Sequence, residues 1–206
     1  MFKLNTIPKR TSTKDFESFT FLNKEKNLRE IDWNCQNLPK LWLYNLHYFD
    51  FLNQKNQGID HFEKQNDLIT DWLNKNPIGF GVGFEPYPTS IRIVNWIKWI
   101  WFNQHLSAEI NLSLWNQVWW VFRRLEFHIL GNHLFANAKA LTFVGAYLKG
   151  DESKELLDKG VHLINSELNE QFLPDGGHFE LSPMYHEILI WDLLELIDLA
   201  GTSQNE

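Results

Sequence analysis

The heptapeptide GNHLFAN, residues 131–137, marks the start of a helix in a chain built from helical patterns. Gly131 interrupts the pattern before it, and Asn132 is a residue type that often caps the first turn of a helix. From Leu134 to residue 148, apolar residues recur three and four positions apart, as they do in amphipathic helices. We therefore predict a helix capped by Asn132, with polar side chains at the positive end of its dipole.

The same helical periodicity recurs on both sides of this stretch. It covers residues 62–73, 91–102, 114–129, 156–168 and 188–199. No stretch alternates between apolar and polar residues over a useful length, so the sequence predicts an all-α fold. Residues 1–37 show little periodicity, and we interpret them as an irregular or extended lead-in to a helical domain at residues 38–206.

Three helix starts are marked by capping residues or by proline. They are Thr89 and Ser90 after Pro88, Asn132 after Gly131, and Ser182 before Pro183. These starts lie about 40 to 50 residues apart, the length of one helical hairpin. Because antiparallel neighbours make alternate helices parallel, all three starts should lie at one end of the molecule. Repeated hairpins of this kind curve into a solenoid or a toroid that offers a cleft.

The composition argues against several classes of protein. The chain has 206 residues, 44% of them hydrophobic, which is enough for one sizeable core. A net charge of -7 argues against nucleic-acid binding, which usually requires a basic face. Cys35 is the single cysteine, so no disulfide within the chain and no cysteine-based zinc site can form. We expect no signal peptide and no membrane span, because no apolar run is long enough.

Two polar corners lie at the predicted helix starts. The first holds Asn132, His133 and Asn137, of which the last two share a helix face, and the second holds Tyr185 and His186. Each of these residues has an ordinary alternative role as a helix cap, a packed tyrosine or a solvated histidine. Finding both corners at one end of the molecule favours a functional site. Arg92 and the loop at residues 79–87 should lie at this same end.

Carboxylates and histidines at this end allow other chemistry. Glu85 and Glu180 could act as acid and base in glycoside hydrolysis, although they and Asp175 could equally cap loops or orient neighbouring side chains. A metal site built from three histidines is conceivable, but their sequence spacing lacks the close pairs of known zinc motifs. The histidines concerned are His133, His178 and His186. We therefore expect no metal site in this chain.

Four motifs together resemble the heparinase II/III family of polysaccharide lyases. They are LWLYNLHYFD at residues 41–50, EPYPTSIR at 85–92, GNHLFAN at 131–137 and DGGHFELSPMYH at 175–186. The resemblance runs from about Trp33 to the C-terminus, and the last two motifs are the most specific. It implies an (α/α) toroid followed by a C-terminal antiparallel β-sandwich. It also implies β-elimination on an acidic polysaccharide that contains uronic acid.

The resemblance also implies roles for individual residues. Asn132 and His133 match the pair that neutralises the uronate carboxylate, and Tyr185 matches the tyrosine that protonates the leaving glycosidic oxygen. Such donors are needed because the C5 proton is hardly acidic while the neighbouring carboxylate keeps its charge. Supporting or substrate-binding roles are expected for Tyr87, Arg92, Asn137, His178, Glu180 and His186.

The chain departs from the family pattern in its extent. It resembles only the first part of the toroid, without the closing helices or the β-sandwich. A fragment, a truncated reading frame and a degenerate relative all stay open as interpretations, and so does whether this part is active alone. We expect no cofactor in this part, and its location in the cell stays open, since many relatives that digest external polymers are exported. Two other functions remain as alternatives: a glycoside hydrolase on an (α/α) toroid, and a helical module that binds carbohydrate without turnover.

Overall fold

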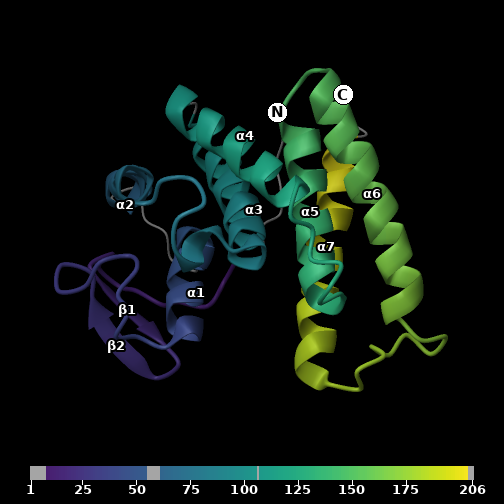
Figure 1. Ribbon diagram of the computed structural model, residues 1–206, viewed down its shortest axis with the longest axis horizontal. Helices are drawn as coiled ribbons and strands as arrows, with labels where there is room; N and C mark the ends of the chain where they lie inside the picture. The colour runs from purple at the N-terminus through teal and green to yellow at the C-terminus, as the bar shows by residue number, and fades with distance from the viewer. Residues whose placement is uncertain (1–7, 55–60, 106, 204–206) are drawn as a thin grey trace.

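The computed structural model describes residues 8–54, 61–105 and 107–203. Within these ranges it contains seven α-helices, two short 3-10 helices and a two-stranded sheet (Figure 1). In chain order the elements are β1 (Ser18–Phe21), β2 (Lys24–Asn27), α1 (Lys40–Tyr48), η1 (Asp50–Asn53), α2 (His61–Lys75), η2 (Val82–Phe84), α3 (Pro86–Asn103), α4 (Ala108–Phe122), α5 (Gly131–Tyr147), α6 (Asp151–Gln171) and α7 (Pro183–Ser203). The predicted all-α class is confirmed, and closure into a toroid stays a prediction.

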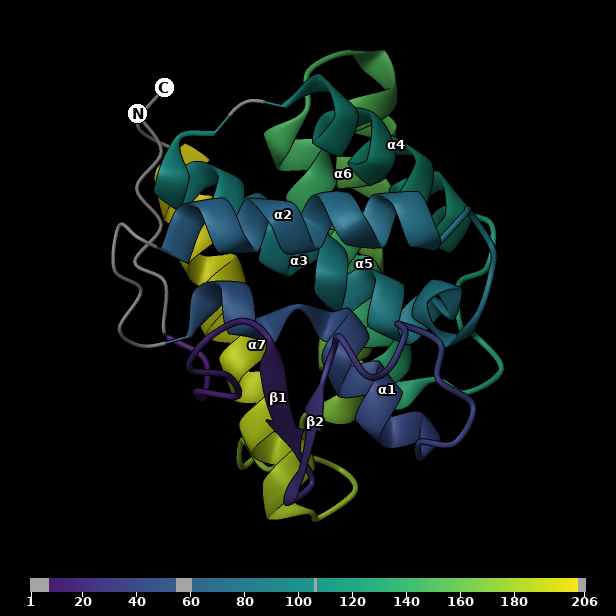
Figure 2. The same ribbon diagram turned by 90° about the vertical axis from the view of Figure 1, so that its left-hand side faces the viewer.

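The helices are arranged around α3 and α5. Figures 1 and 2 show α1, α2 and the β-hairpin on one side of α3, and α6 and α7 beside α5. Every residue of α5 from Leu134 to Gly145 is buried, because most of this helix is apolar around its whole circumference. Gly160 lets α6 approach α5 closely, since a Cβ there would lie 2.5 Å from the Thr142 Oγ1 atom. No helix within the described ranges is long and apolar enough to cross a membrane.

The predicted convergence of helix starts is present in the structure. Figure 1 shows α3, α5 and α7 beginning at the same, lower end. α7 begins at Pro183, as its start signal predicts. The first turns of α3 and α5 are in contact through Tyr87 and His133, whose rings stack with their centroids 4.3 Å apart.

The predicted cap of α5 was wrong. This helix begins at Gly131, and the preceding Leu130 has a φ of 62° and forms no side-chain cap. Asn132 therefore lies within the first turn, where its amide Nδ2 donates to the Tyr87 hydroxyl at 3.3 Å. A side chain expected to satisfy its own helix instead joins two helices.

Two other helix boundaries differ from the sequence prediction. α3 begins at Pro86 rather than near Ser90, because proline fits the first turn of a helix, where no backbone donor is required. The periodicity at residues 114–129 predicted a helix that ends later than α4 does. α4 starts earlier, at the Ser107 cap that accepts from the backbone N of Ile110, and it ends at Phe122.

The lead-in contains a β-hairpin that the sequence prediction lacked. β1 and β2 pair antiparallel, and the two-residue turn between them places Leu22 and Asn23 at φ values of 53° and 59°. Both values suit the type of turn that joins twisted strands. Phe19 and Phe21 are buried, and the Phe21 ring packs edge-on against Trp42 of α1 at 5.2 Å. Two buried positions are too few to produce a recognisable alternation.

A buried ion network fastens α7 to α3 and α5. The Lys98 Nζ atom lies 2.5 Å from Glu195 Oε1, and Lys139 donates to both Glu195 and, at 2.7 Å, Asp192. The Trp191 indole also donates to Glu195, at 3.0 Å. Burial alone would raise the pKa of the Glu195 carboxyl, but the positive charges of Lys139 and Lys98 hold it well below its ordinary value.

We expect Glu195→Gln to destabilise the fold by about 3–5 kcal/mol, because the substitution leaves two buried lysines with one carboxylate between them. Chemical unfolding at neutral pH measures this loss. Glu187→Gln is the matched control, since Glu187 is an exposed residue of the same helix, and its effect should stay within about 0.5 kcal/mol. Equal stability of the Glu195 variant and the native protein would show that the network does not hold α7.

His47 is a second buried polar group in the core. The Trp72 indole donates to its Nδ1 at 2.9 Å, so the imidazole carries its proton on Nε2, which donates to the Trp33 carbonyl at 2.9 Å. Burial, together with the nearby positive charge of Arg92, lowers the pKa of His47 to about 3. The folded protein therefore holds His47 neutral.

Because this pKa lies below the value of 6.5 for an unperturbed histidine, His47 contributes stability at neutral pH that is lost as the pH falls from about 6.5 towards about 3. The loss is on the order of 1.4 kcal/mol per pH unit. Unfolding free energies across this range should fall less steeply for His47→Gln than for the native protein. His162→Gln, a change on the exposed face of α6, should keep the native slope.

Candidate functional site

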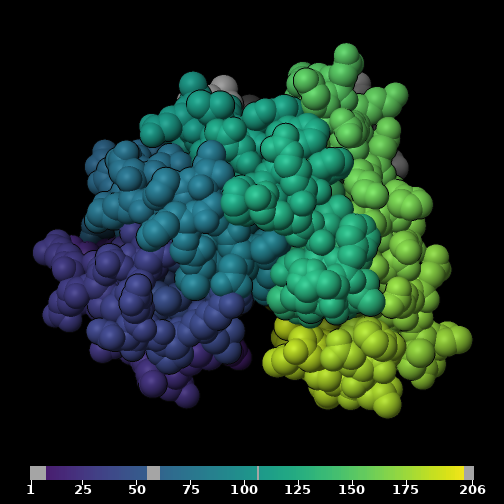
Figure 3. Space-filling model, in the orientation of Figure 1, coloured from purple at the N-terminus to yellow at the C-terminus, as the bar shows by residue number. Residues whose placement is uncertain are grey.

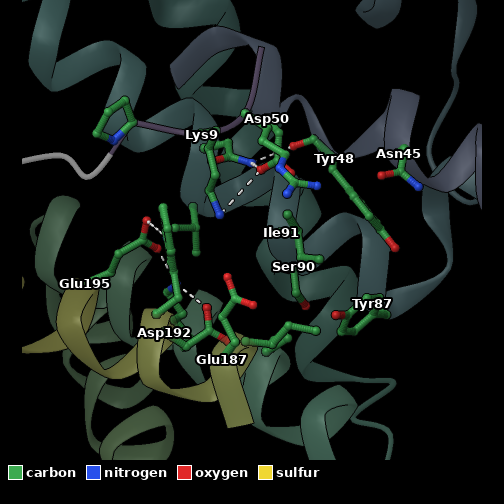
Figure 4. Close-up of a pocket in the computed structure, with 18 of the residues that line it drawn as sticks. Lys9, Asn45, Tyr48, Asp50, Tyr87, Ser90, Ile91, Glu187, Asp192 and Glu195 are labelled. Carbon is green, nitrogen blue, oxygen red and sulfur yellow. Dashed lines mark hydrogen bonds and ion pairs between the residues drawn. The ribbon is translucent and has the colours of Figure 1, made fainter. Parts of the chain in front are cut away.

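A pocket of about 660 Å³ opens between α1, η1 and α3 on one side and α5 and α7 on the other. Its walls come from residues 8–11, from α1 and η1, from α3, and from α5 and α7. Figure 3 shows a notch between the purple segment around residues 40–50 and the yellow start of α7, the parts that form opposite walls. Figure 4 shows Tyr48, Asp50 and Tyr87 on one side of the pocket, and Glu187, Asp192 and Glu195 on the other.

Lys9 connects the two walls. Its Nζ atom lies 3.6 Å from Asp50 Oδ1 and 5.0 Å from the centre of the Trp191 ring on α7. Its backbone N donates to the Asn53 carbonyl at 2.8 Å, which anchors the segment on η1. One lysine thus contacts both η1 and α7 at the edge of the pocket.

Tyr87, Asn132 and His133 form a polar cluster beside the pocket. Tyr87 belongs to the lining, Asn132 donates to its hydroxyl, and His133 stacks on its ring at an interplanar angle of 25°. The His133 Nδ1 atom lies 3.0 Å from Glu126 Oε1, so this nitrogen carries a proton and donates to the carboxylate. The cluster offers an amide, an imidazole and a phenol at the place where two helices begin.

The pocket tyrosines remain protonated at neutral pH. Burial and, secondarily, the negative charge of Asp192 raise the pKa of Tyr87 well above its ordinary value. Burial also raises the pKa of Tyr48, whose ring lies edge-on to Tyr87 at 6.0 Å. Both phenols can therefore donate a hydrogen bond to a ligand, and neither can serve as a base in this state.

Asn137, predicted to bind substrate, is fully buried behind the cluster. Its Nδ2 atom donates to Glu126 Oε2 at 3.0 Å and to Ser90 Oγ at 3.1 Å, while its Oδ1 accepts from the backbone N of Glu126 at 2.9 Å. Asn137 thus holds the carboxylate that orients His133. With no exposed surface, its side chain does not reach the pocket.

Arg92, also predicted to bind substrate, lies in the core with no exposed surface. Its guanidinium donates to the Gly83 carbonyl at 2.7 Å and to Gln117 Oε1 at 2.8 Å, and it stacks on the Trp72 ring at 4.0 Å. These contacts fix the loop before α3. A substrate-binding role does not fit this placement, because burial hides the whole side chain.

The second corner lies at the start of α7, outside the lining of the pocket. Tyr185 is half-buried, and its ring centre lies 6.3 Å from that of His178. His178 is buried, accepts from the backbone N of Glu180 at 3.4 Å and contacts Gln171 Oε1 at 3.2 Å. The His186 Nδ1 atom is buried and has no hydrogen-bond partner within the described ranges.

Gln171 links this corner to the first one. Its Nε2 atom donates to the carbonyl of Gly131 at 3.0 Å, while its Oε1 faces His178. Glu180 also reaches the first turn of α5, since its Oε1 lies 3.6 Å from where a Cβ on Gly131 would be. The structure therefore brings the His178 and Glu180 loop against the helix that carries Asn132 and His133.

The predicted carboxylate pair does not share the pocket. Glu85 is ion-paired with Lys40 at 2.8 Å and accepts a short hydrogen bond from Tyr44, whose pKa burial raises to about 12. Neither Glu85 nor Glu180 lines the pocket. Among the residues that the structure describes, no three histidine, cysteine or acidic side chains group closely enough to hold a metal ion.

Some pocket residues were missed by the sequence analysis. Tyr48 lies within the LWLYNLHYFD motif, where it could have been singled out. Lys139 is a lone lysine in an otherwise apolar helical stretch, a pattern that suggests a buried ion pair. Lys9 carries no sequence signal, because its position depends on how the lead-in folds back onto η1.

Comparisons with known proteins point to polysaccharide lyases. Residues 121–206 match the family model described as "Heparinase II/III N-terminus". The chain is 35% identical over 90 residues to the heparin-sulfate lyase of Bacteroides stercoris. This alignment covers 39% of the chain and 14% of that relative, so the chain spans only a small part of the relative's length. No solved structure matches the chain.

Proposed function

Residues 121–206 are heparinase II/III-like, and on this premise we propose that the chain is part of a polysaccharide lyase that cleaves uronic-acid-containing glycans by β-elimination. The observation that carries the proposal is the cluster of Tyr87, Asn132 and His133 beside the pocket. The cluster supplies hydrogen-bond donors at converging helix starts, which favour a bound carboxylate.

In the proposed reaction, a base removes the proton at C5 of the uronate, and the electron pair forms the C4–C5 double bond as the glycosidic oxygen leaves C4. Negative charge accumulates on the uronate carboxylate before the bond to oxygen breaks. Asn132 and His133 are proposed to donate to this carboxylate, where each donor lowers the barrier more than it stabilises the bound substrate. Glu126 supports this role by accepting from His133 Nδ1. We assign the base to no residue of this chain.

Tyr185 is proposed to donate its phenolic proton to the leaving oxygen. This role is supported by the position of Tyr185 in the first turn of α7. The loop before α7 is held against α5 by Gln171, which donates to the Gly131 carbonyl. Because Tyr185 lies outside the pocket lining, the glycan would extend from the pocket across the start of α7. Tyr87, His178, Glu180 and His186 are proposed to support or contact the substrate there.

The alternative functions lack a specific supporting observation. Hydrolysis would need two carboxylates on either side of one bond, but Glu85 is engaged by Lys40 and Tyr44. A binding module without turnover would use the same pocket. Product analysis separates all three: a lyase releases unsaturated ends that absorb ultraviolet light, a hydrolase releases saturated ends, and a binding module releases neither.

We expect Asn132→Ala to lower kcat by roughly 10²–10³-fold, the usual effect of removing one donor to a developing oxyanion. The assay follows ultraviolet absorbance of unsaturated ends formed from heparan sulfate by the protein that carries this chain. Asn169→Ala is the matched control, because Asn169 is exposed on α6 and its side chain donates to the Asn165 carbonyl of the same helix. Native turnover by the Asn132 variant would refute its assignment.

Tyr185→Phe should reduce kcat by roughly 10²–10⁴-fold, as expected for the loss of a general acid. Substrates with a better leaving group should regain part of this loss, since they need less protonation. Tyr147→Phe, which removes a hydroxyl bonded to Asn111 near the opposite end of α5, should leave kcat unchanged. If the Tyr185 variant keeps full activity, the proton comes from another group.

A further inference from the structure

Two exposed arginines follow α4 directly, and each lies over a tryptophan ring, Arg124 in stacking contact and Arg123 farther from its ring. The Arg124 guanidinium lies 3.4 Å from the centre of the Trp120 ring, and the Arg123 guanidinium lies 5.7 Å from that of Trp119. Arg124 also donates weakly to the Trp120 carbonyl, at 3.5 Å. Stacking of this kind holds a guanidinium in place while its edge donors stay accessible.

Neither arginine forms an ion pair with a carboxylate among the residues that the structure describes. By contrast, the exposed Arg29 is paired with Glu17 at 2.6 Å, and Arg92 is buried. Arg123 and Arg124 are thus adjacent exposed cations without a carboxylate partner in the described part of the chain. They leave two guanidinium forks available for an anionic ligand.

These arginines are tied to the candidate site. The Trp120 indole donates to the Phe84 carbonyl at 2.7 Å, three residues before Tyr87. The two arginines begin the segment of residues 123–130 between α4 and α5. This segment also contains Glu126, the partner of His133. Figure 3 shows the segment around residues 120–130, coloured teal to green, on the face where the notch opens.

We propose that Arg123 and Arg124 form an anion-binding subsite for a glycan that extends out of the pocket. The ligand group is a sulfate or a uronate carboxylate, because both present the paired oxygens that a guanidinium fork binds in bidentate geometry. Phe127, which is 52% exposed in the same segment, offers a ring against which a sugar can pack. The ligand class rests on the proposed function, whereas the site rests on two adjacent arginines that lie over tryptophan rings and have no carboxylate partner among the described residues.

Calorimetric titration of the protein that carries this chain tests the subsite, using a heparin hexasaccharide and an unsulfated uronate hexasaccharide as probes. Arg123→Gln combined with Arg124→Gln should weaken binding roughly fivefold to tenfold and make it less dependent on salt. Loss for the heparin probe alone identifies sulfate as the ligand group, and loss for both identifies the carboxylate. Arg29→Gln, which removes one exposed but paired arginine, should bind both probes as the native protein does.

Arg124→Lys provides a second test, because it keeps the charge and removes the planar fork. We expect its affinity to lie between those of the native protein and the double variant. Native affinity in the double variant, or an equal loss in Arg29→Gln, would overturn the subsite. If the double variant loses affinity but the native protein releases no unsaturated ends, the subsite stands and the proposed lyase reaction fails. If unsaturated ends form while all variants bind the probes equally, the lyase reaction stands and the subsite fails.

Discussion

The position of α7 depends on one carboxylate, that of Glu195, held between Lys98 of α3 and Lys139 of α5. α7 also packs through Leu189 and Leu199, which are buried in the core, while Ile190, Leu194 and Ile197 are 38%, 46% and 67% exposed. A buried ion pair seldom adds much net stability, but it strongly disfavours arrangements that separate its members. The network therefore specifies where α7 lies more than how tightly it is held.

This specification matters for the candidate site because the same residues belong to both. Lys139 and Glu195 line the pocket, and Tyr87 lines it from the opposite wall. A shift of α7 would move its first turn, which carries Tyr185, relative to Asn132 and His133. Two more tethers act at the same end: Gln171 joins the loop before α7 to α5, and Lys9 joins η1 to α7. The pocket thus has a geometry set by pairings between distant parts of the chain.

The sequence predicted those features of the fold that follow from local patterns. Apolar spacing identified the helices after α1, and counting hairpins placed the starts of α3, α5 and α7 at one end. Prediction from the sequence failed for side chains whose partners lie far away along the chain. Asn132 looks like a cap until Tyr87 is placed beside it, and Arg92 looks like a ligand-binding residue until its carbonyl partners enclose it. The partner of Lys98, Glu195, lies 97 residues away, beyond any periodicity argument.

The charged residues of the chain fall into two groups, those buried against partners inside the protein and those exposed on its surface. Lys98 and Lys139 are neutralised inside the protein, and Arg92 is enclosed by carbonyls and rings, so these three cations contribute little to the outer surface. At physiological salt, exposed charges act over a Debye length of about 8 Å, so the net charge of -7 does not decide whether an anion can bind at one place. The exposed charges close to a site decide whether an anion can bind there. The acid nearest to Arg123 and Arg124 in sequence, Glu126, is buried and already bound to His133 and Asn137, so its charge is not offered to either arginine.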